Sequence, residues 1–214
     1  MKKYGDGLPE LCVYYLFNQI VGGIEDMHNQ KIIHRDIKPD NIGLTSNFDI
    51  KIFDFTTAKS LDETDITQAC GTLNYMSPQY IIGKVKIPKE AWIKLDTFSL
   101  GVVLYYLTYG REPYKIYNRD NTNEIVNPIN SIDWLFDSSD KEINPDLKDL
   151  INNLITIDDK KRLNLFNVRT SNWFKRCKQA IQAIQNKMKL KEKILFQFLE
   201  LKKLNLDNYF KITN

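Results

Sequence analysis

A short polar run and one acidic residue further along the chain carry the side chains best suited to chemistry. The run is His34-Arg35-Asp36-Ile37-Lys38-Pro39-Asp40-Asn41, and Asp54 comes after it. Phosphoryl transfer needs a carboxylate to accept the proton of an attacking hydroxyl, cations near the developing charge, and oxygen ligands for Mg²⁺. Asp36 can face the hydroxyl, and Lys38, two residues along an extended backbone, points the same way. Asn41 and Asp54 offer oxygens that suit Mg²⁺.

This run resembles the catalytic loop of the eukaryotic protein kinases, which it matches at every characteristic position. The resemblance implies that Asp36 is the catalytic base, that Lys38 contacts the transferred phosphate, and that Mg²⁺ is held by Asn41 and Asp54. It also implies ATP as a cofactor, and the residues placed along ATP are Lys38, Asp40, Asn41, Gly43 and Asp54. The loop is similar to that of the serine/threonine branch, whose members transfer the γ-phosphate of ATP to protein substrates.

The resemblance continues downstream of the catalytic loop and covers residues 4–174 in the family's order. Residues 70–79 are similar to the end of a kinase activation segment, with Thr72 where the substrate-facing threonine sits. Asp96 matches the buried aspartate that, in the family, hydrogen-bonds the backbone of the catalytic loop. Arg162 matches the family's late arginine.

The family's smaller lobe carries a G-x-G-x-x-G loop, a strand lysine and a helix glutamate. The nine glycines of this sequence do not form that spacing. We therefore expect the larger, C-terminal lobe of a kinase, as a fragment or truncated gene product, and no phosphotransfer by the isolated chain. A separate smaller lobe or an upstream segment would then be a partner. The other possibility is a lobe that works without a nucleotide lid. The alternative is a non-catalytic, kinase-like module that binds or scaffolds other proteins.

Three residues depart from the family's pattern. Thr56 stands where the family has Gly, and its β-branched side chain narrows the backbone conformations. Gln79 replaces the glutamate that pairs with the late arginine, so a contact with Arg162 would be a hydrogen bond to an uncharged acceptor. Gly43 replaces a large apolar residue beneath the adenine, which would weaken nucleotide packing by about 1–2 kcal/mol. None of these changes removes a group that the transfer needs.

Side chains near the predicted catalytic groups have structural or regulatory interpretations. His34 is expected to pack against Phe55 rather than to transfer protons. Thr64 and Thr67 are candidate phosphorylation sites, and Arg35 is available to pair with a phosphate.

The elements that must position these groups are mostly helices. Hydrophobic periodicity predicts them over residues 8–28, 95–109, 146–157 and 164–174, with a last helix through the tail. Two apolar runs, Ile42–Leu44 and Ile50–Phe53, flank turn-forming residues and predict a small β-ribbon. Residues 54–78 read as a functional loop, and residues 115–145 as loop-dominated. The predicted class is mainly α, with a kinase lobe over residues 1–174 and a basic amphipathic helical tail over residues 175–214.

The tail is strongly basic. Residues 175–214 contain ten Lys/Arg and three acidic residues, whereas the whole chain has a net charge of +3. Its apolar residues fall at helical spacings among lysines, as in helices that bind calmodulin or anionic membranes, and they are Ile181, Ile184, Met188, Leu195 and Phe198. Lys191 interrupts this stripe, which favours at least as much a helix that covers the lobe and has a solvated basic face.

Composition excludes several other classes of protein. The hydrophobic fraction of 43% and the charged fraction of 27% are ordinary for a soluble globular protein. No run reaches the ~18 apolar residues of a membrane span, and the N-terminus lacks the apolar core of a signal peptide. The three cysteines are odd in number and far apart, which favours a reducing, cytoplasmic setting. No nucleic-acid partner is expected.

Overall fold

The computed structural model describes residues 7–63, 70–82, 89–114, 142–187 and 210–213. Its α-helices are α1 (Glu10–Asn29), α2 (Pro78–Ile82), α3 (Ile93–Tyr109), α5 (Pro145–Leu154), α6 (Leu165–Thr170) and α7 (Asn172–Lys187). Its strands are β1 (Ile32–Ile33), β2 (Ile42–Thr45), β3 (Ile50–Ile52), β4 (Lys59–Ser60) and β5 (Lys211–Thr213). Short 3₁₀ helices are η1 (Pro39–Asn41), η2 (Phe55–Thr57), η3 (Leu73–Tyr75) and η4 (Lys89–Ala91). The mainly helical class is confirmed.

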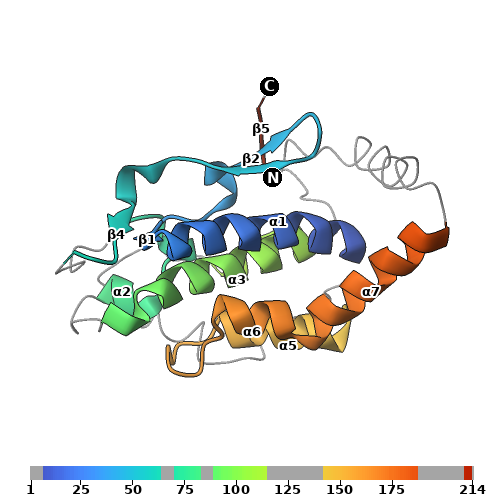
Figure 1. Cartoon of the computed structure of the whole chain (residues 1–214). Coiled ribbons are helices and arrows are strands. Elements are labelled where there is room, and N and C mark those ends of the chain that lie inside the picture. The colour runs from blue at the N-terminus through green and yellow to red at the C-terminus, as the bar shows by residue number, and fades with distance from the viewer. Residues whose placement is uncertain (1–6, 64–69, 83–88, 115–141, 188–209, 214) are drawn as a thin grey trace.

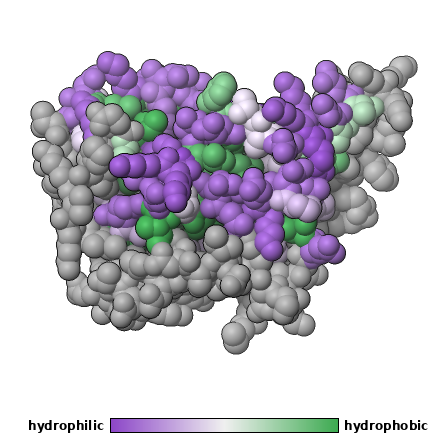
Figure 2. All heavy atoms as spheres, turned by 90° about the horizontal axis from the view of Figure 1, so that it is seen from below, coloured by the Kyte–Doolittle hydropathy of each residue, from purple (hydrophilic) through white to green (hydrophobic). Residues whose placement is uncertain are grey.

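The core lies around two helices in the middle of the molecule. Figure 1 shows α1 and α3 side by side, with the β2–β3 ribbon on one side and α5, α6 and α7 on the other. The approach of α5 to α3 depends on Gly101, because a Cβ there would lie 2.6 Å from the Cβ of Leu154. Seen from below, the described surface is mainly hydrophilic with separate hydrophobic patches (Figure 2). No described helix is long and apolar enough to cross a membrane.

The helices predicted before the tail are confirmed, with one difference. The helices predicted over residues 8–28, 95–109 and 146–157 correspond to α1, α3 and α5. The helix predicted over residues 164–174 is interrupted at Ser171, where α6 ends and α7 begins. The Ser171 hydroxyl donates to the carbonyl of Val168 (2.8 Å) and accepts from the N–H of Phe174 (3.3 Å), so it caps both helices. Residues 115–141 of the predicted loop lie outside the described residues.

The predicted ribbon is present. β2 and β3 are antiparallel, with Ile42 opposite Ile52 and Leu44 opposite Ile50. The short strands β1 and β4 also pair antiparallel. This pairing joins the residues directly before the predicted catalytic loop to those that follow η2. All three cysteines are free.

A third strand joins the ribbon, and the sequence did not predict it. β5 runs parallel to β2, with Lys211 opposite Gly43, and it also contacts η1. Phe210, directly before β5, is 4% exposed and belongs to the hydrophobic core. The prediction of a helix through the whole tail is therefore wrong for residues 211–213. The reason is that burial of Phe210 brings this end of the chain to the open edge of β2.

The remainder of the tail is only partly described. α7 crosses the predicted boundary at residue 174, and Cys177 is buried in the same core as α1. Ile181 packs against that core, which favours the interpretation of this helix as a cover for the lobe. Of the other residues of the apolar stripe, Met188, Leu195 and Phe198 lie outside the described residues. The division of the chain at residue 174 stays a prediction.

A buried cation, Arg162, joins the loop between α5 and α6 to the first turn of α3 and to α2. Arg162 is 1% exposed and, among the described residues, forms no ion pair. Its guanidinium donates to the carbonyls of Thr156 (2.7 Å) and Lys94 (2.9 Å) and to Oε1 of Gln79 (3.2 Å). Burial lowers the pKa of Arg162 to about 10, which still leaves it charged at neutral pH. The predicted hydrogen bond between Gln79 and Arg162 is confirmed.

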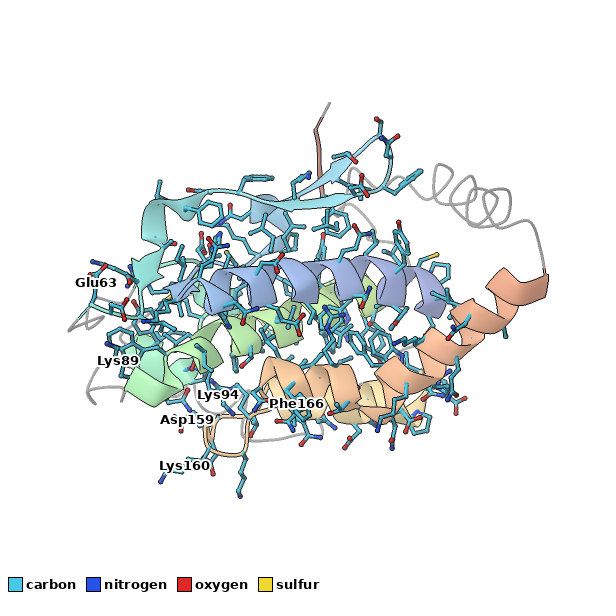
Figure 3. All side chains as sticks on the ribbon, in the orientation of Figure 1. Glu63, Lys89, Lys94, Asp159, Lys160 and Phe166 are labelled. Atoms are coloured by element: carbon cyan, nitrogen blue, oxygen red, sulfur yellow. The ribbon has the colours of Figure 1, made fainter. Side chains whose placement is uncertain are left out.

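Replacement of Phe210 by Ala tests how much β5 contributes to stability. We expect Phe210→Ala to lower the free energy of unfolding by about 3–5 kcal/mol, because a buried aromatic side chain is lost. Urea denaturation followed by circular dichroism measures this change. The matched control is Phe166→Ala on α6, since Phe166 is 72% exposed and lies on the outer side of the helices (Figure 3). Equal effects of the two substitutions would contradict the burial of Phe210.

Restoring an acidic partner for Arg162 should stabilise the chain. We expect Gln79→Glu to raise the free energy of unfolding at pH 7 by about 1–2 kcal/mol, because Arg162 is already desolvated and gains a charged acceptor. The new carboxyl group should have a folded pKa below its unfolded value of about 4.3, so the gain is complete above that pH and is lost as the pH falls further. Denaturation at pH 7 and pH 3 tests this, with Gln182→Glu on the exposed face of α7 as the control. A destabilised Gln79→Glu variant would contradict it.

Candidate active site

The predicted catalytic loop is anchored from beneath by Asp96 of α3. This carboxylate is fully buried and accepts hydrogen bonds from the backbone N–H groups of His34 (2.9 Å) and Arg35 (2.8 Å) and from Nε2 of His28 (2.8 Å). Burial alone would raise the pKa of Asp96, but the hydrogen bond and charge of His28 and the two backbone N–H groups lower it below its usual value. The role predicted for Asp96 is thereby seen in its contacts. His28, which sequence analysis missed, is part of the same anchor.

Asp36 is the centre of a hydrogen-bonded cluster. Its Oδ1 accepts from the backbone N–H of Thr72 (2.9 Å). Its Oδ2 accepts from Nδ2 of Asn41 (2.9 Å) and pairs with Nζ of Lys38 (2.9 Å). Lys38 also donates to the hydroxyl of Thr72 (2.6 Å). The structure therefore brings together four predicted site residues from two segments that are distant in sequence.

The close approach of the segment before Thr72 requires glycine. Gly71 has a φ of +107°, and a Cβ at this position would lie 2.6 Å from the carbonyl oxygen of Arg35. Any other residue would therefore push the segment away from the catalytic loop. Asn41 is fixed on the opposite side of Asp36, because its Nδ2 donates to the backbone carbonyl of Asp36 (2.9 Å) as well as to Oδ2. Its amide oxygen takes part in neither bond.

Asp54 lies at the start of η2 and is solvent-exposed. Its backbone is left-handed, with φ +64°, a conformation that Asp adopts more readily than most residues. Its Oδ1 accepts from the hydroxyl of Thr56 (2.7 Å) and from the N–H of Thr56 (3.4 Å). The hydrogen bond from the Thr56 hydroxyl is the main reason that the pKa of Asp54 is lowered, and the charges of Lys38 and His34 add to it. From the sequence, only the effect of Thr56 on the backbone was considered, and this hydrogen bond from its side chain was not predicted.

The segment around Asp54 is fastened to the catalytic loop by neighbours of Asp36. The ring of His34 packs against Phe55, with 5.2 Å between ring centroids, as predicted. The hydroxyl of Thr57 donates to the carbonyl of His34 (2.9 Å), and Nε of Arg35 donates to the carbonyl of Thr57 (2.6 Å). No sequence signal indicated Thr57, because its role depends on contacts across the two segments.

Two predicted site residues stand apart from this cluster. Gly43 is buried in the middle strand β2, between Lys51 of β3 and Lys211 of β5. Asp40 is exposed on η1. Their predicted contacts with a nucleotide stay predictions.

Arg35, the predicted partner of a phosphate, is largely buried. Besides Thr57, it donates to the hydroxyl of Tyr80 (2.7 Å), and Sγ of Cys70 lies 3.6 Å from the same hydroxyl. The candidate phosphorylation sites Thr64 and Thr67 lie outside the described residues.

The anchor at Asp96 predicts a specific dependence of stability on pH. Because the pKa of Asp96 is lowered by folding, its contribution is complete above about pH 4, the usual value for Asp, and is lost as the pH falls through the folded pKa. We expect Asp96→Asn to lower the free energy of unfolding at pH 7 by about 2–4 kcal/mol and to flatten its loss in acid. Urea denaturation at several pH values measures both, with the exposed Asp62→Asn as the control. Equal acid slopes in the two variants would contradict this assignment.

The sequence matches the protein kinase domain family over residues 4–174. It is 34% identical over 158 residues to the probable serine/threonine-protein kinase KIN1 homolog of Enterocytozoon bieneusi, covering 73% of this chain and 25% of that protein. It is 31% identical over 159 residues to the carbon catabolite-derepressing protein kinase of Secale cereale, covering 74% and 30%.

A third relative is the cell cycle serine/threonine-protein kinase CDC5/MSD2 of Saccharomyces cerevisiae. The identity is 36% over 170 residues, covering 78% of this chain and 23% of that protein. The chain thus spans less than a third of the length of each of these relatives. The match includes most of the chain and every residue of the cluster around Asp36. The chain therefore belongs to the protein kinase domain family.

Proposed function

We propose that the chain carries the catalytic loop of a serine/threonine protein kinase, which transfers the γ-phosphate of ATP to Ser or Thr of protein substrates. The observation that carries this proposal is the environment of Asp36. Asp36 is 8% exposed, and its carboxylate is held at once by the N–H of Thr72, by Asn41 and by Lys38. A carboxylate fixed in this way has the preorganisation that positioning of an attacking hydroxyl requires.

Each group in the cluster has a defined task in this proposal. Asp36 orients the substrate hydroxyl and accepts its proton. Lys38 lies between Asp36 and the hydroxyl of Thr72, so its ammonium group can meet negative charge that develops on the transferred phosphate without a large movement. Thr72 fixes the activation segment against the catalytic loop through both its N–H and its hydroxyl. The surface that receives the substrate then lies where these two segments meet.

The donor set fits Mg²⁺ bound together with a nucleotide. Asn41 would contribute its amide oxygen and Asp54 its carboxylate. Within the described residues, no group of three or more His, Cys, Asp or Glu side chains could hold a metal by itself. Mg²⁺ commonly binds through one or two carboxylates plus substrate phosphates, which agrees with such a sparse set. When bound, Mg²⁺ neutralises charge on the phosphates.

We further propose that the chain corresponds to the larger lobe of a kinase. The helical core, the catalytic loop and the ribbon support this proposal, and the 214 residues contain no G-x-G-x-x-G. A glycine-rich loop and a strand lysine normally position the phosphates, and loss of positioning can lower a rate by several powers of ten. We therefore expect phosphotransfer to need a smaller lobe in addition to these residues.

Replacement of Asp36 tests the proposed function. In a fusion of the 214-residue chain to the smaller lobe of a related kinase, we expect Asp36→Asn to lower kcat by roughly 10²–10⁴-fold, because proton acceptance and orientation are lost. Transfer of labelled γ-phosphate to a Ser/Thr protein substrate measures this rate. The control is Asp62→Asn, the same substitution at an exposed site. Unchanged turnover in Asp36→Asn would contradict the assignment, and an inactive but substrate-binding fusion would favour a non-catalytic docking module.

A further inference from the structure

The contact between Thr56 and Asp54 restricts how this carboxylate can bind a cation. The Thr56 hydroxyl donates to Oδ1 of Asp54 over 2.7 Å, and the Thr56 N–H reaches the same oxygen over 3.4 Å. Both donors therefore hold one oxygen of the carboxylate. In the described part of the chain, no hydrogen bond reaches Oδ2. Asp54, an exposed residue, thus has one hydrogen-bonded oxygen, Oδ1, and one oxygen, Oδ2, without a hydrogen bond from the described residues.

Other charged groups do not account for this asymmetry. Lys38 and His34 influence Asp54 only through their charge, and neither donates a hydrogen bond to it. Lys38 is already engaged by Asp36 and Thr72. The orientation of the exposed Asp54 side chain therefore depends on Thr56. The left-handed backbone of Asp54 places the carboxylate over η2, where these two donors lie.

We propose that Thr56 is a positioning residue that makes Asp54 a one-oxygen ligand and so favours Mg²⁺ over Ca²⁺. This inference rests on the proposed function, because it assumes that Asp54 binds the metal. Mg²⁺ is a small ion with octahedral coordination, and it usually binds a single oxygen of each carboxylate. Ca²⁺ takes more oxygen ligands and often binds both oxygens of one carboxylate. Binding through both oxygens would compete with the hydroxyl of Thr56 for Oδ1. Loss of the hydroxyl should therefore help Ca²⁺ more than Mg²⁺.

A purely structural role for Thr56 makes a different prediction. The Asp54 side chain caps η2 through the N–H of Thr56, and this bond does not need the hydroxyl. If capping were the only role, removal of the hydroxyl would leave the relative affinities for the two cations unchanged. The ratio of the affinities for Ca²⁺ and Mg²⁺, and not the free energy of unfolding, therefore distinguishes the two roles of Thr56.

The experiment is a nuclear magnetic resonance titration of the whole 214-residue chain with MgCl₂ or CaCl₂ at constant ionic strength. Amide shifts of residues 54–57 report binding and are suited to the millimolar affinities of a site with few protein ligands. The variants are Thr56→Val, which removes the hydroxyl and keeps the branched shape, and Thr56→Ser, which keeps the hydroxyl. Thr56 is exposed, so neither variant disturbs the core.

The expected result is a fall in the ratio of Kd for Ca²⁺ to Kd for Mg²⁺ by roughly threefold or more in Thr56→Val, with Thr56→Ser close to wild type. Three-bond couplings that report the χ1 angle of Asp54 should show one rotamer in wild type and Thr56→Ser and rotamer averaging in Thr56→Val. An unchanged ratio in Thr56→Val overturns the inference.

Asp54→Asn separates failure of this inference from failure of the assignment beneath it. If Asp54 is a ligand, this variant abolishes the saturable shifts with both cations. If the shifts persist in Asp54→Asn, Asp54 is not a metal ligand, and both the inference and that part of the proposed function are wrong. If Asp54→Asn abolishes the shifts while Thr56→Val keeps the wild-type ratio, only the role of Thr56 is wrong.

Discussion

The site depends on the burial of one negative charge. Asp96 lies within a central helix that is apolar almost all round, and a carboxylate in such a place is tolerated only if hydrogen-bond donors surround it. The donors are two consecutive N–H groups of the catalytic loop and the ring of His28. Because the loop supplies two of these three donors, the helix cannot bury its carboxylate without also fixing the loop backbone. Arg35 takes up a left-handed conformation in this arrangement.

From this anchor towards the solvent, fewer groups hold each carboxylate of the candidate site. Asp36 is held by three different groups and is almost inaccessible, which suits a side chain that must orient a proton acceptor. Asp54 is exposed and depends on a single neighbour for its orientation. The carboxylates of Asp36 and Asp54 therefore differ in what holds them in place. One is preorganised by the fold, and the other by a local turn, so a single substitution can alter the second without affecting the first.

How much of this could be predicted from sequence depended on the range of the interactions. The helix α1 and the ribbon were predictable because local periodicity and a turn between apolar runs indicate them. The cluster of Asp36, Lys38 and Asn41 was predictable because its members are neighbours in one motif. The strand β5 was not predictable, because its pairing with β2 joins residues far apart in sequence. That pairing depends on which edge of the β2–β3 ribbon is open and on the burial of Phe210. The hydroxyl contact of Thr56 and the bridging role of Thr57 likewise depend on how the chain folds back on itself.

The pairing of β5 with β2 also affects the order in which the described elements can form during synthesis on the ribosome. Residues of β2 emerge long before those of β5, and at translation rates of about 5–20 residues per second the interval is roughly 8–30 s. Throughout that time the edge of β2 beside η1 lacks the strand that will cover it, and it is open to other extended chains. Helices α1, α3 and α5 can pack in the meantime, since all of them precede β5. Among the described elements β5 is therefore the last to be synthesised, and its pairing with β2 completes the ribbon beside η1, the short helix that carries Asn41 of the candidate active site.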